Sequence, residues 1–92
     1  MQADFTVEVG AGVDKLRFTL NGKDDGANDL DLFVRFGSAA TTSVYDARSV
    51  LGGMFEEIEV NAPTAGTWHV HVARYAGPAL IPHQLTVTAL EP

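Results

Sequence analysis

Four aspartates stand close together in the segment GKDDGANDLDL (residues 22–32), where turn-forming residues lead into an apolar run. Asp29 and Asp31 lie two residues apart, so on a β-strand they share one face with their Cα atoms roughly 6.5–7 Å apart. Asp24 precedes them and could bring a third carboxylate. Carboxylate oxygens suit Ca²⁺, which takes about six to eight oxygen ligands. Asp24, Asp29 and Asp31 are therefore candidate calcium ligands. We expect the chain to bind either calcium or no cofactor.

The same aspartates also have a structural interpretation. Asp29 can support the turn by accepting hydrogen bonds from nearby backbone groups, as aspartate often does. Two carboxylates on one face repel each other unless a cation, an arginine or solvent compensates them. Arg48 is the arginine that we expect to pair with Asp31. The sequence favours this structural role and leaves the metal site open.

Two histidines alternate with apolar residues in the segment TWHVHV. His69 and His71 would share one face of a strand, a spacing that can chelate zinc or nickel. Such a site needs a third ligand, and the sequence places neither His83 nor a carboxylate beside them. We therefore expect both histidines on the solvent-facing side of an outer strand.

Three aromatic residues are candidates for ligand binding, because exposed aromatic side chains are typical anchors at binding surfaces. Tyr45 lies in a polar segment and Tyr75 ends an alternating one. Trp68 shares the parity of Val70 and Val72, which favours a place in the core over an exposed platform.

Glu56 has the same parity as Ile58 and Val60, which predicts an inward side chain that needs a partner. Alternatively, a bulge near Gly53 shifts the register and turns Glu56 outward. No serine, cysteine or glycine-rich nucleophile turn accompanies this glutamate. The sequence therefore predicts no enzyme activity.

The segments that must position these side chains alternate apolar and polar residues, the period of a half-buried strand. None carries a helical stripe. Short turns rich in Gly, Pro, Asn and Asp separate them. The expected strands cover residues 5–9, 16–20, 29–36, 41–49, 55–60, 67–75 and 85–89. We predict an all-β fold: a single antiparallel β-sandwich or jelly roll of about seven to eight strands, forming one domain over residues 1–92.

Composition excludes several classes of partner. Six Lys and Arg against twelve Asp and Glu give a formal net charge of −6, which repels nucleic acid. No apolar run is long enough for a membrane span, and no segment resembles a signal peptide. The absence of cysteine excludes disulfides and thiolate sites.

Five phrases of the sequence occur in the order and spacing of a known family. They are LRFTLNG, NDLDLFVRFGS, TTSVYDARS, EEIEVNAPTAGTWHVHVARYAG and QLTVTA. Members of the bacterial pre-peptidase C-terminal (PPC) family carry a strand of the type D-x-D-L-Y-V-R-x-G. Thr-Thr, Tyr-Asp-x-Arg, a Glu-led strand and Ala-Gly-Thr-aromatic-x-Val then follow. The chain resembles this family from about residue 16 to residue 89.

The resemblance implies a non-catalytic β-sandwich appended to secreted proteases and other extracellular hydrolases. The expected partners are the catalytic domain of a parent secreted enzyme and an extracellular protein or polysaccharide. Some relatives in bacterial collagenases bind collagen, and some of those bind calcium. Many protease-attached members have a cysteine where this chain has Ala47, so here the core alone must hold the fold.

The expected function is that of a secreted accessory domain, which binds substrate or matrix or supports the folding and secretion of its parent enzyme. A jelly-roll carbohydrate-binding module is the alternative. It requires a row of exposed aromatic residues or a lined groove, and the sequence offers few such residues.

Overall fold

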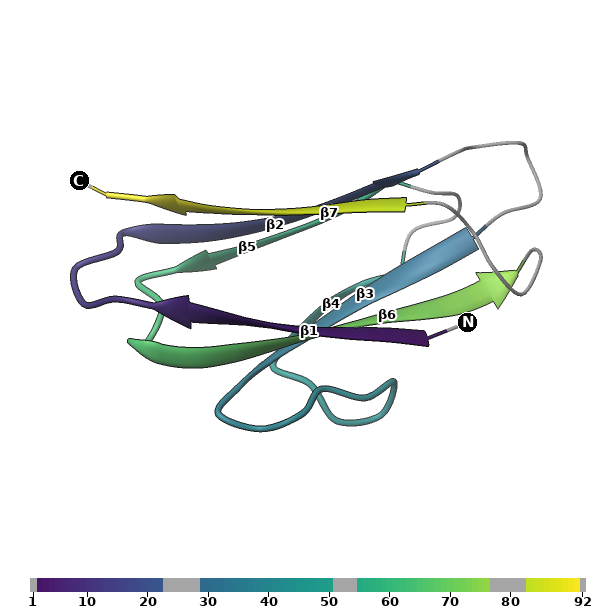
Figure 1. The fold of residues 1–92 in the computed structure, drawn as a ribbon, viewed down its shortest axis with the longest axis horizontal. Helices are drawn as coiled ribbons and strands as arrows, with labels where there is room; N and C mark the ends of the chain where they lie inside the picture. Colours follow the sequence, from purple (N-terminus) through teal and green to yellow (C-terminus); the bar gives the residue numbers. More distant parts are fainter. Residues whose placement is uncertain (1, 23–28, 51–54, 77–82, 92) are drawn as a thin grey trace.

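Two antiparallel sheets lie face to face in this protein (Figure 1). The structure is a computed structural model that describes residues 2–22, 29–50, 55–76 and 83–91. Within these ranges the strands are β1 (Gln2–Val9), β2 (Lys15–Gly22), β3 (Asp29–Phe36), β4 (Ala47–Ser49), β5 (Glu56–Asn61), β6 (Gly66–Ala76) and β7 (His83–Leu90). One sheet has the order β1-β6-β3-β4 and the other the order β5-β2-β7. The predicted all-β sandwich is confirmed. The described ranges contain no helix with the length and apolarity that crossing a membrane requires.

The space between the sheets is filled by the apolar side chains that alternate along the strands. Leu30, Leu32 and Val34 of β3 face Leu16 and Phe18 of β2, and all five are almost completely buried. Trp68 belongs to the same core, with 5% of its surface exposed. Its indole Nε1 donates a hydrogen bond to the carbonyl oxygen of Thr64 at 3.0 Å, so its polar atom is satisfied.

Gly66 begins β6 at a position that no other residue could occupy without strain. Its φ is +136°, and a Cβ there would lie 2.9 Å from Cε1 of Phe36. The missing side chain lets the Phe36 ring pack edge-on against Trp68, with 5.5 Å between the ring centroids. The Ala-Gly-Thr phrase therefore has glycine at this position because the ring of Phe36 packs closely against it while contacting Trp68.

The segment between β3 and β4 covers the face of the four-stranded sheet that points away from the other sheet (Figure 1). Phe33, Ala40 and Ala73 form a second small core there, with Tyr45 packed against it. Only residues 47–49 of the strand expected over residues 41–49 are extended and paired. The rest is a turn, because Oγ1 of Thr41 accepts hydrogen bonds from the backbone N–H groups of Ser43 and Val44.

Candidate functional site

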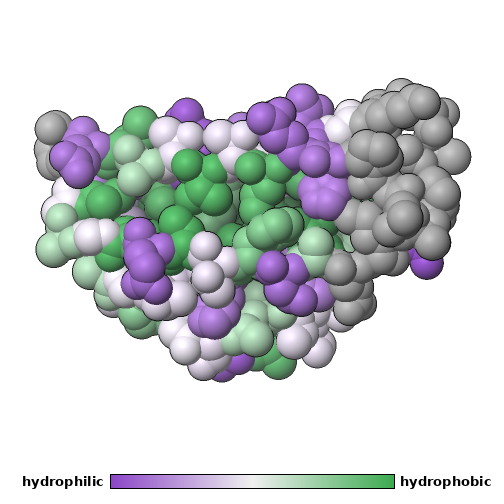
Figure 2. Space-filling model, in the orientation of Figure 1, coloured by the Kyte–Doolittle hydropathy of each residue, from purple (hydrophilic) through white to green (hydrophobic). Residues whose placement is uncertain are grey.

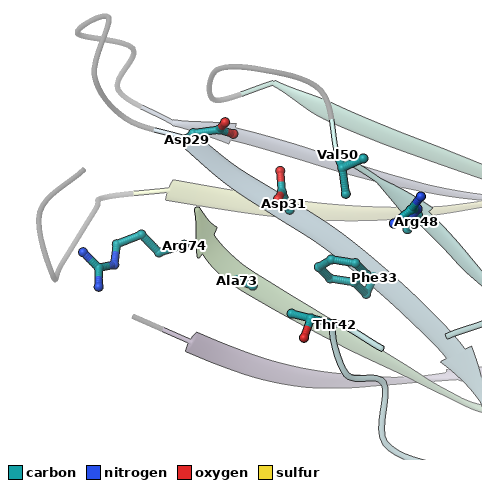
Figure 3. Close-up of a pocket in the computed structure, with 8 residues that line it drawn as sticks. All are labelled: Asp29, Asp31, Phe33, Thr42, Arg48, Val50, Ala73 and Arg74. Carbon is teal, nitrogen blue, oxygen red and sulfur yellow. The ribbon is translucent and has the colours of Figure 1, made fainter. Parts of the chain in front are cut away.

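A cavity of about 550 Å³ lies on this covered face of the four-stranded sheet (Figure 3). Phe33 of β3 and Ala73 of β6 are opposite-facing neighbours of the core residues Leu32 and Val72, so they point outward into the cavity. The charged residues of its wall are Asp29, Asp31, Arg48 and Arg74. Acidic, basic and aromatic groups therefore meet in a single depression.

On the aromatic side of the cavity, two tilted rings and one guanidinium group contact one another. The rings of Phe33 and Tyr45 lie with their centroids 5.5 Å apart. The guanidinium carbon of Arg48 lies 5.4 Å from the centroid of the Tyr45 ring, a cation–π distance. Tyr45 is consequently half-buried and supports the cavity through Phe33 and Arg48.

Of the other two aromatic candidates, Trp68 does not join Tyr45 in one surface. Trp68 points into the core between the sheets, which confirms the core interpretation that its parity favoured. The side chain of Tyr75 lies outside the part of the chain that the structure describes. The predicted ligand-binding set is therefore not brought together among the described residues.

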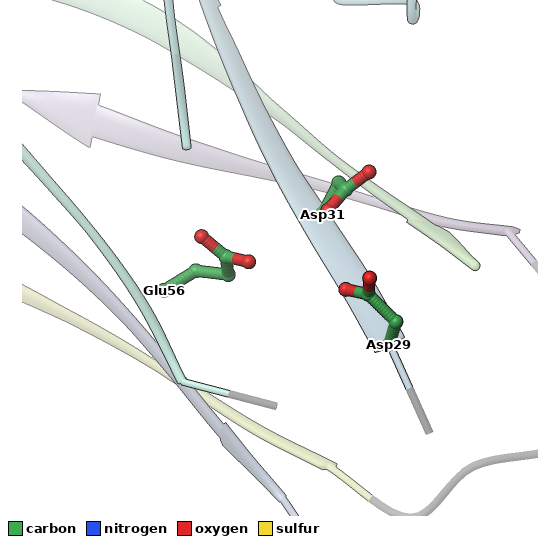
Figure 4. A group of neighbouring side chains, drawn as sticks. All are labelled: Asp29, Asp31 and Glu56. Atoms are coloured by element: carbon green, nitrogen blue, oxygen red, sulfur yellow. The ribbon is translucent and has the colours of Figure 1, made fainter. Parts of the chain in front are cut away.

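Three carboxylates gather at the acidic side of the cavity (Figure 4). Asp29, Asp31 and Glu56 each offer an oxygen, and these oxygens all lie within 4.8 Å of one another. Glu56 begins β5, and it reaches β3 beside the point where the short strand β4 ends. It is completely buried and accepts a hydrogen bond from the hydroxyl of Ser49, so the inward direction predicted for it is confirmed.

These three residues are the ones that could hold a divalent cation in the described ranges. Their hard oxygen donors suit Ca²⁺, although three carboxylates supply only part of the about six to eight oxygens that it takes. Asp24, the third predicted ligand, lies outside the described residues. The sequence did not suggest Glu56 as a companion of the aspartates. Its inward parity was visible, but its closeness to β3 depends on how the sheets pack.

The cluster brings three acidic side chains close together, and they affect one another's ionisation. The pKa of Asp31 is raised from 3.8 to about 6, first by partial burial and then by the neighbouring carboxylates of Asp29 and Glu56. Arg48 acts in the opposite direction and is the weakest of these influences. The expected ion pair between Asp31 and Arg48 is wrong, because no ion pair joins these two described residues and Arg48 lies against Tyr45 instead. A cation in the cavity would relieve this repulsion.

The two histidines share a face of β6, as expected, but their surroundings differ. His71 is buried, and its Nδ1 lies 2.8 Å from Oδ1 of Asp4 on β1. His69 is half-buried and lines a second cavity of about 180 Å³ with Thr6 and Ala39. The prediction that both face solvent is wrong for His71, because residues 37–46 cover this face and β1 pairs alongside β6.

Comparison with known proteins gives matches to proteases. Over 48 residues the chain is 46% identical to xanthomonalisin of Xanthomonas sp. (strain T-22), a match that covers 52% of this chain and 6% of that protein. Over 74 residues it is 34% identical to alkaline serine exoprotease A of Vibrio alginolyticus, covering 80% of this chain and 13% of that protein. The chain thus spans a small part of the length of these relatives.

A solved structure and a family model also match. The crystal structure of Aeromonas hydrophila PliG, a periplasmic lysozyme inhibitor of g-type lysozyme, has a TM-score of 0.54 and 18% identity, over 97% of this chain and 82% of that chain. At this identity the likeness shows the fold alone. The model of the bacterial pre-peptidase C-terminal domain matches residues 2–74, which extend from β1 into β6. The chain therefore belongs to the bacterial pre-peptidase C-terminal domain family.

Proposed function

We propose that this chain is a non-catalytic accessory domain of a secreted hydrolase and that it binds an extracellular polypeptide through the cavity on its four-stranded sheet. The observation that carries the proposal is the meeting of the neighbouring carboxylates of Asp29 and Asp31 with an apolar floor in a cavity of about 550 Å³. The family match and the protease relatives support a parent enzyme as the covalent partner.

The cavity has the chemistry that a basic side chain of a polypeptide requires. The carboxylates of Asp29 and Asp31 can accept charge-assisted hydrogen bonds from an ammonium or guanidinium group. Val50, which lines the cavity and is exposed, offers an apolar surface to the methylene stem of a lysine or arginine. A bound cation would also relieve the repulsion that raises the pKa of Asp31. Polypeptides rich in Lys and Arg are therefore the substrate or matrix class that fits best.

The alternative of a carbohydrate-binding module receives less support. Sugar recognition of that kind uses exposed aromatic faces, and Trp68 is buried in the core. Tyr45 has one neighbour in Phe33 and another in Arg48, which leaves it only half-exposed. A polysaccharide ligand therefore has fewer matching groups than a basic polypeptide.

A retention assay on insoluble matrices tests the proposal. The 92-residue chain is passed over collagen, casein, chitin, cellulose and cell-wall preparations. We expect retention on protein, weakened about tenfold or more by Asp31→Asn, because a charge-assisted hydrogen bond contributes about 1.5–3 kcal/mol. Asp14→Asn, which changes an exposed aspartate outside the cavity, is the matched control and should leave retention unchanged.

Three results would contradict this proposal. Retention on polysaccharide alone would favour the carbohydrate-binding alternative. Retention on no matrix would leave a role in the folding and secretion of the parent enzyme. Equal weakening by Asp31→Asn and Asp14→Asn would show that binding depends on net charge and not on the cavity.

A further inference from the structure

The two flanks of the sandwich differ in how their edge strands are protected. On one flank lie β4 and β5. β4 has only three residues, which offers little backbone to another strand. The β5 edge carries Glu57 and Glu59, which form ion pairs with Arg17 and Lys15 of β2. Short strands and charged side chains are the devices by which proteins prevent edge-to-edge association.

The opposite flank, formed by β1 and β7, is less protected, since its strands are long and its charged side chains are the acids Asp4 and Glu8 of β1. Both strands are eight residues long and pair with their inner neighbour without a register shift. Neither contains Lys, Arg or Pro. The two acids of β1 are held by β6, since Asp4 is hydrogen-bonded to His71 and Glu8 accepts a hydrogen bond from Thr67. Among the described residues no strand pairs with the outer backbone edge of β1, so this edge can accept a further strand.

An apolar strip runs along this flank between the two edge strands. Phe5 of β1 is 41% exposed, and Ala3 and Val7 on the same face of β1 are only partly buried. Leu85 and Val87 of β7 are also partly buried, and the half-buried side chains of both strands pack against the core. In Figure 2, which views the molecule from this flank, apolar residues form a continuous band between more polar rims. The core of the sandwich thus reaches the surface here.

We propose that this flank is the interface of a two-fold dimer, in which β1 pairs antiparallel with β1 of a second copy about an axis at Phe5. In an antiparallel ladder, side chains that lie opposite each other share a face. A two-fold axis between two residues would pair positions whose side chains lie on different faces of the sheet. The axis must therefore lie at a residue, which is then opposite its own copy, so that apolar positions lie opposite apolar positions. This dimer does not depend on the function proposed for the cavity, which lies on a different face.

The charges of β1 select the axis. An axis at Asp4 places that carboxylate opposite its own copy, and an axis at Thr6 places Asp4 opposite Glu8. Like charges directly opposite each other destabilise a sheet. An axis at Val7 leaves residues 2–4 unpaired. An axis at Phe5 places Ala3 opposite Val7 and Asp4 opposite Thr6, so no like charges meet and the apolar residues cluster.

The same two-fold operation accommodates β7. Figure 1 shows β1 and β7 running in the same direction across this flank. An axis that crosses both sheets at right angles to the strands therefore also turns β7 antiparallel to its copy. The flank lies within the largest face of the molecule, whose Cα extents are 40 and 24 Å against a depth of 17 Å. A stable interface takes about 800 Å² from each partner, which a face of this size can supply.

Introduced cysteines provide a sharp test, because the chain has none of its own. In the proposed register the Cα atoms of position 5 lie about 4.5–5.5 Å apart across the axis. That separation permits a disulfide, whose Cα atoms are usually about 4.4–6.8 Å apart. Position 6 is the matched control, because its two copies are offset diagonally by about 7–8 Å.

We expect the wild-type 92-residue chain to sediment as a dimer at millimolar concentration. Phe5→Cys should form a covalent dimer on mild oxidation about tenfold faster than Thr6→Cys. Phe5→Lys should sediment as a monomer with an unchanged circular dichroism spectrum, since its two ammonium groups would meet at the axis. The fold should tolerate these changes because Phe5 is partly exposed.

Three outcomes would overturn the proposal. A wild-type chain that stays monomeric at millimolar concentration would mean that another segment or partner covers the flank. Equal cross-linking of Phe5→Cys and Thr6→Cys would exclude the register. A dimer that survives Phe5→Lys would be formed by a different surface.

Discussion

Replacing Asp31 with asparagine removes a negative charge from the carboxylate cluster while keeping the size of the side chain. In the folded protein the pKa of Asp31 is raised from 3.8 to about 6, first by burial and then by Asp29 and Glu56. A folded-state pKa above the unfolded value means that the folded chain holds more protons between these two pH values. Stability therefore falls as the pH rises from about 4 to about 6, and the full penalty applies above that window.

The size of the effect follows from the shift. Each pKa unit corresponds to about 1.4 kcal/mol, so the difference between 3.8 and about 6 sets an upper limit of about 3 kcal/mol. Asp31 is partly exposed, and solvent screening reduces this value to about 1–2 kcal/mol. We therefore expect Asp31→Asn to stabilise the protein by that amount at pH 7.5. At pH 4, where the wild-type carboxyl is protonated, the two proteins should be nearly equal.

Urea denaturation followed by circular dichroism at pH 4, 5, 6 and 7.5 measures this prediction. Asp14→Asn changes an exposed aspartate outside the cluster and controls for the loss of one negative charge from the molecule. An Asp31→Asn variant that is less stable than wild type at pH 7.5 would refute the reasoning. It would show that the Asp31 carboxylate is stabilised by a partner, as in the ion pair with Arg48 that the sequence suggested.

Two further predictions concern the core and the metal. Trp68→Ala should destabilise the protein by about 3–5 kcal/mol in urea denaturation followed by circular dichroism, because the ring is buried between the sheets; a loss below about 1 kcal/mol would show that the ring is not part of the core. We also propose that Ca²⁺ binds the carboxylate cluster weakly. The Tm in millimolar Ca²⁺ should therefore exceed the Tm in chelator by a few degrees at most, and Asp29→Asn should abolish this difference. A rise above about ten degrees in scanning fluorimetry would indicate a tight site.

The strands were predictable because their signal is local. Side chains alternate between the two faces of a strand, so a half-buried strand leaves a period of two in the sequence itself. On this basis Trp68 was assigned to the inward face, and Glu56 had inward parity with a bulge as the alternative; both are buried. The weakest alternation, over residues 41–49, gave the largest error. There the hydroxyl of Thr41 stabilises a turn, and only residues 47–49 pair with β3.

The segments that cover each face of a strand were not predictable from the sequence in the same way. His71 has the outward parity expected of it, yet it is buried, because β1 pairs with β6 and residues 37–46 cover that face. Arg48 lies in the strand that was predicted over residues 41–49, but it contacts the ring of Tyr45 and not the carboxylate of Asp31. In both cases the contacts of the side chain depend on another segment of the chain. The alternation within one strand does not reveal which segment will pack against it.

The sequence by itself determined that this chain forms strands of alternating apolar and polar residues, that Asp29 and Asp31 share one face, and that Trp68 points inward. These are consequences of the strand period, which each segment carries alone. Only the tertiary structure decided that Glu56 meets the two aspartates, that a cavity forms over Phe33, and that β1 and β7 leave one flank open. Those features depend on which strands become neighbours and where β4 ends, and both are settled by packing between segments far apart in the chain.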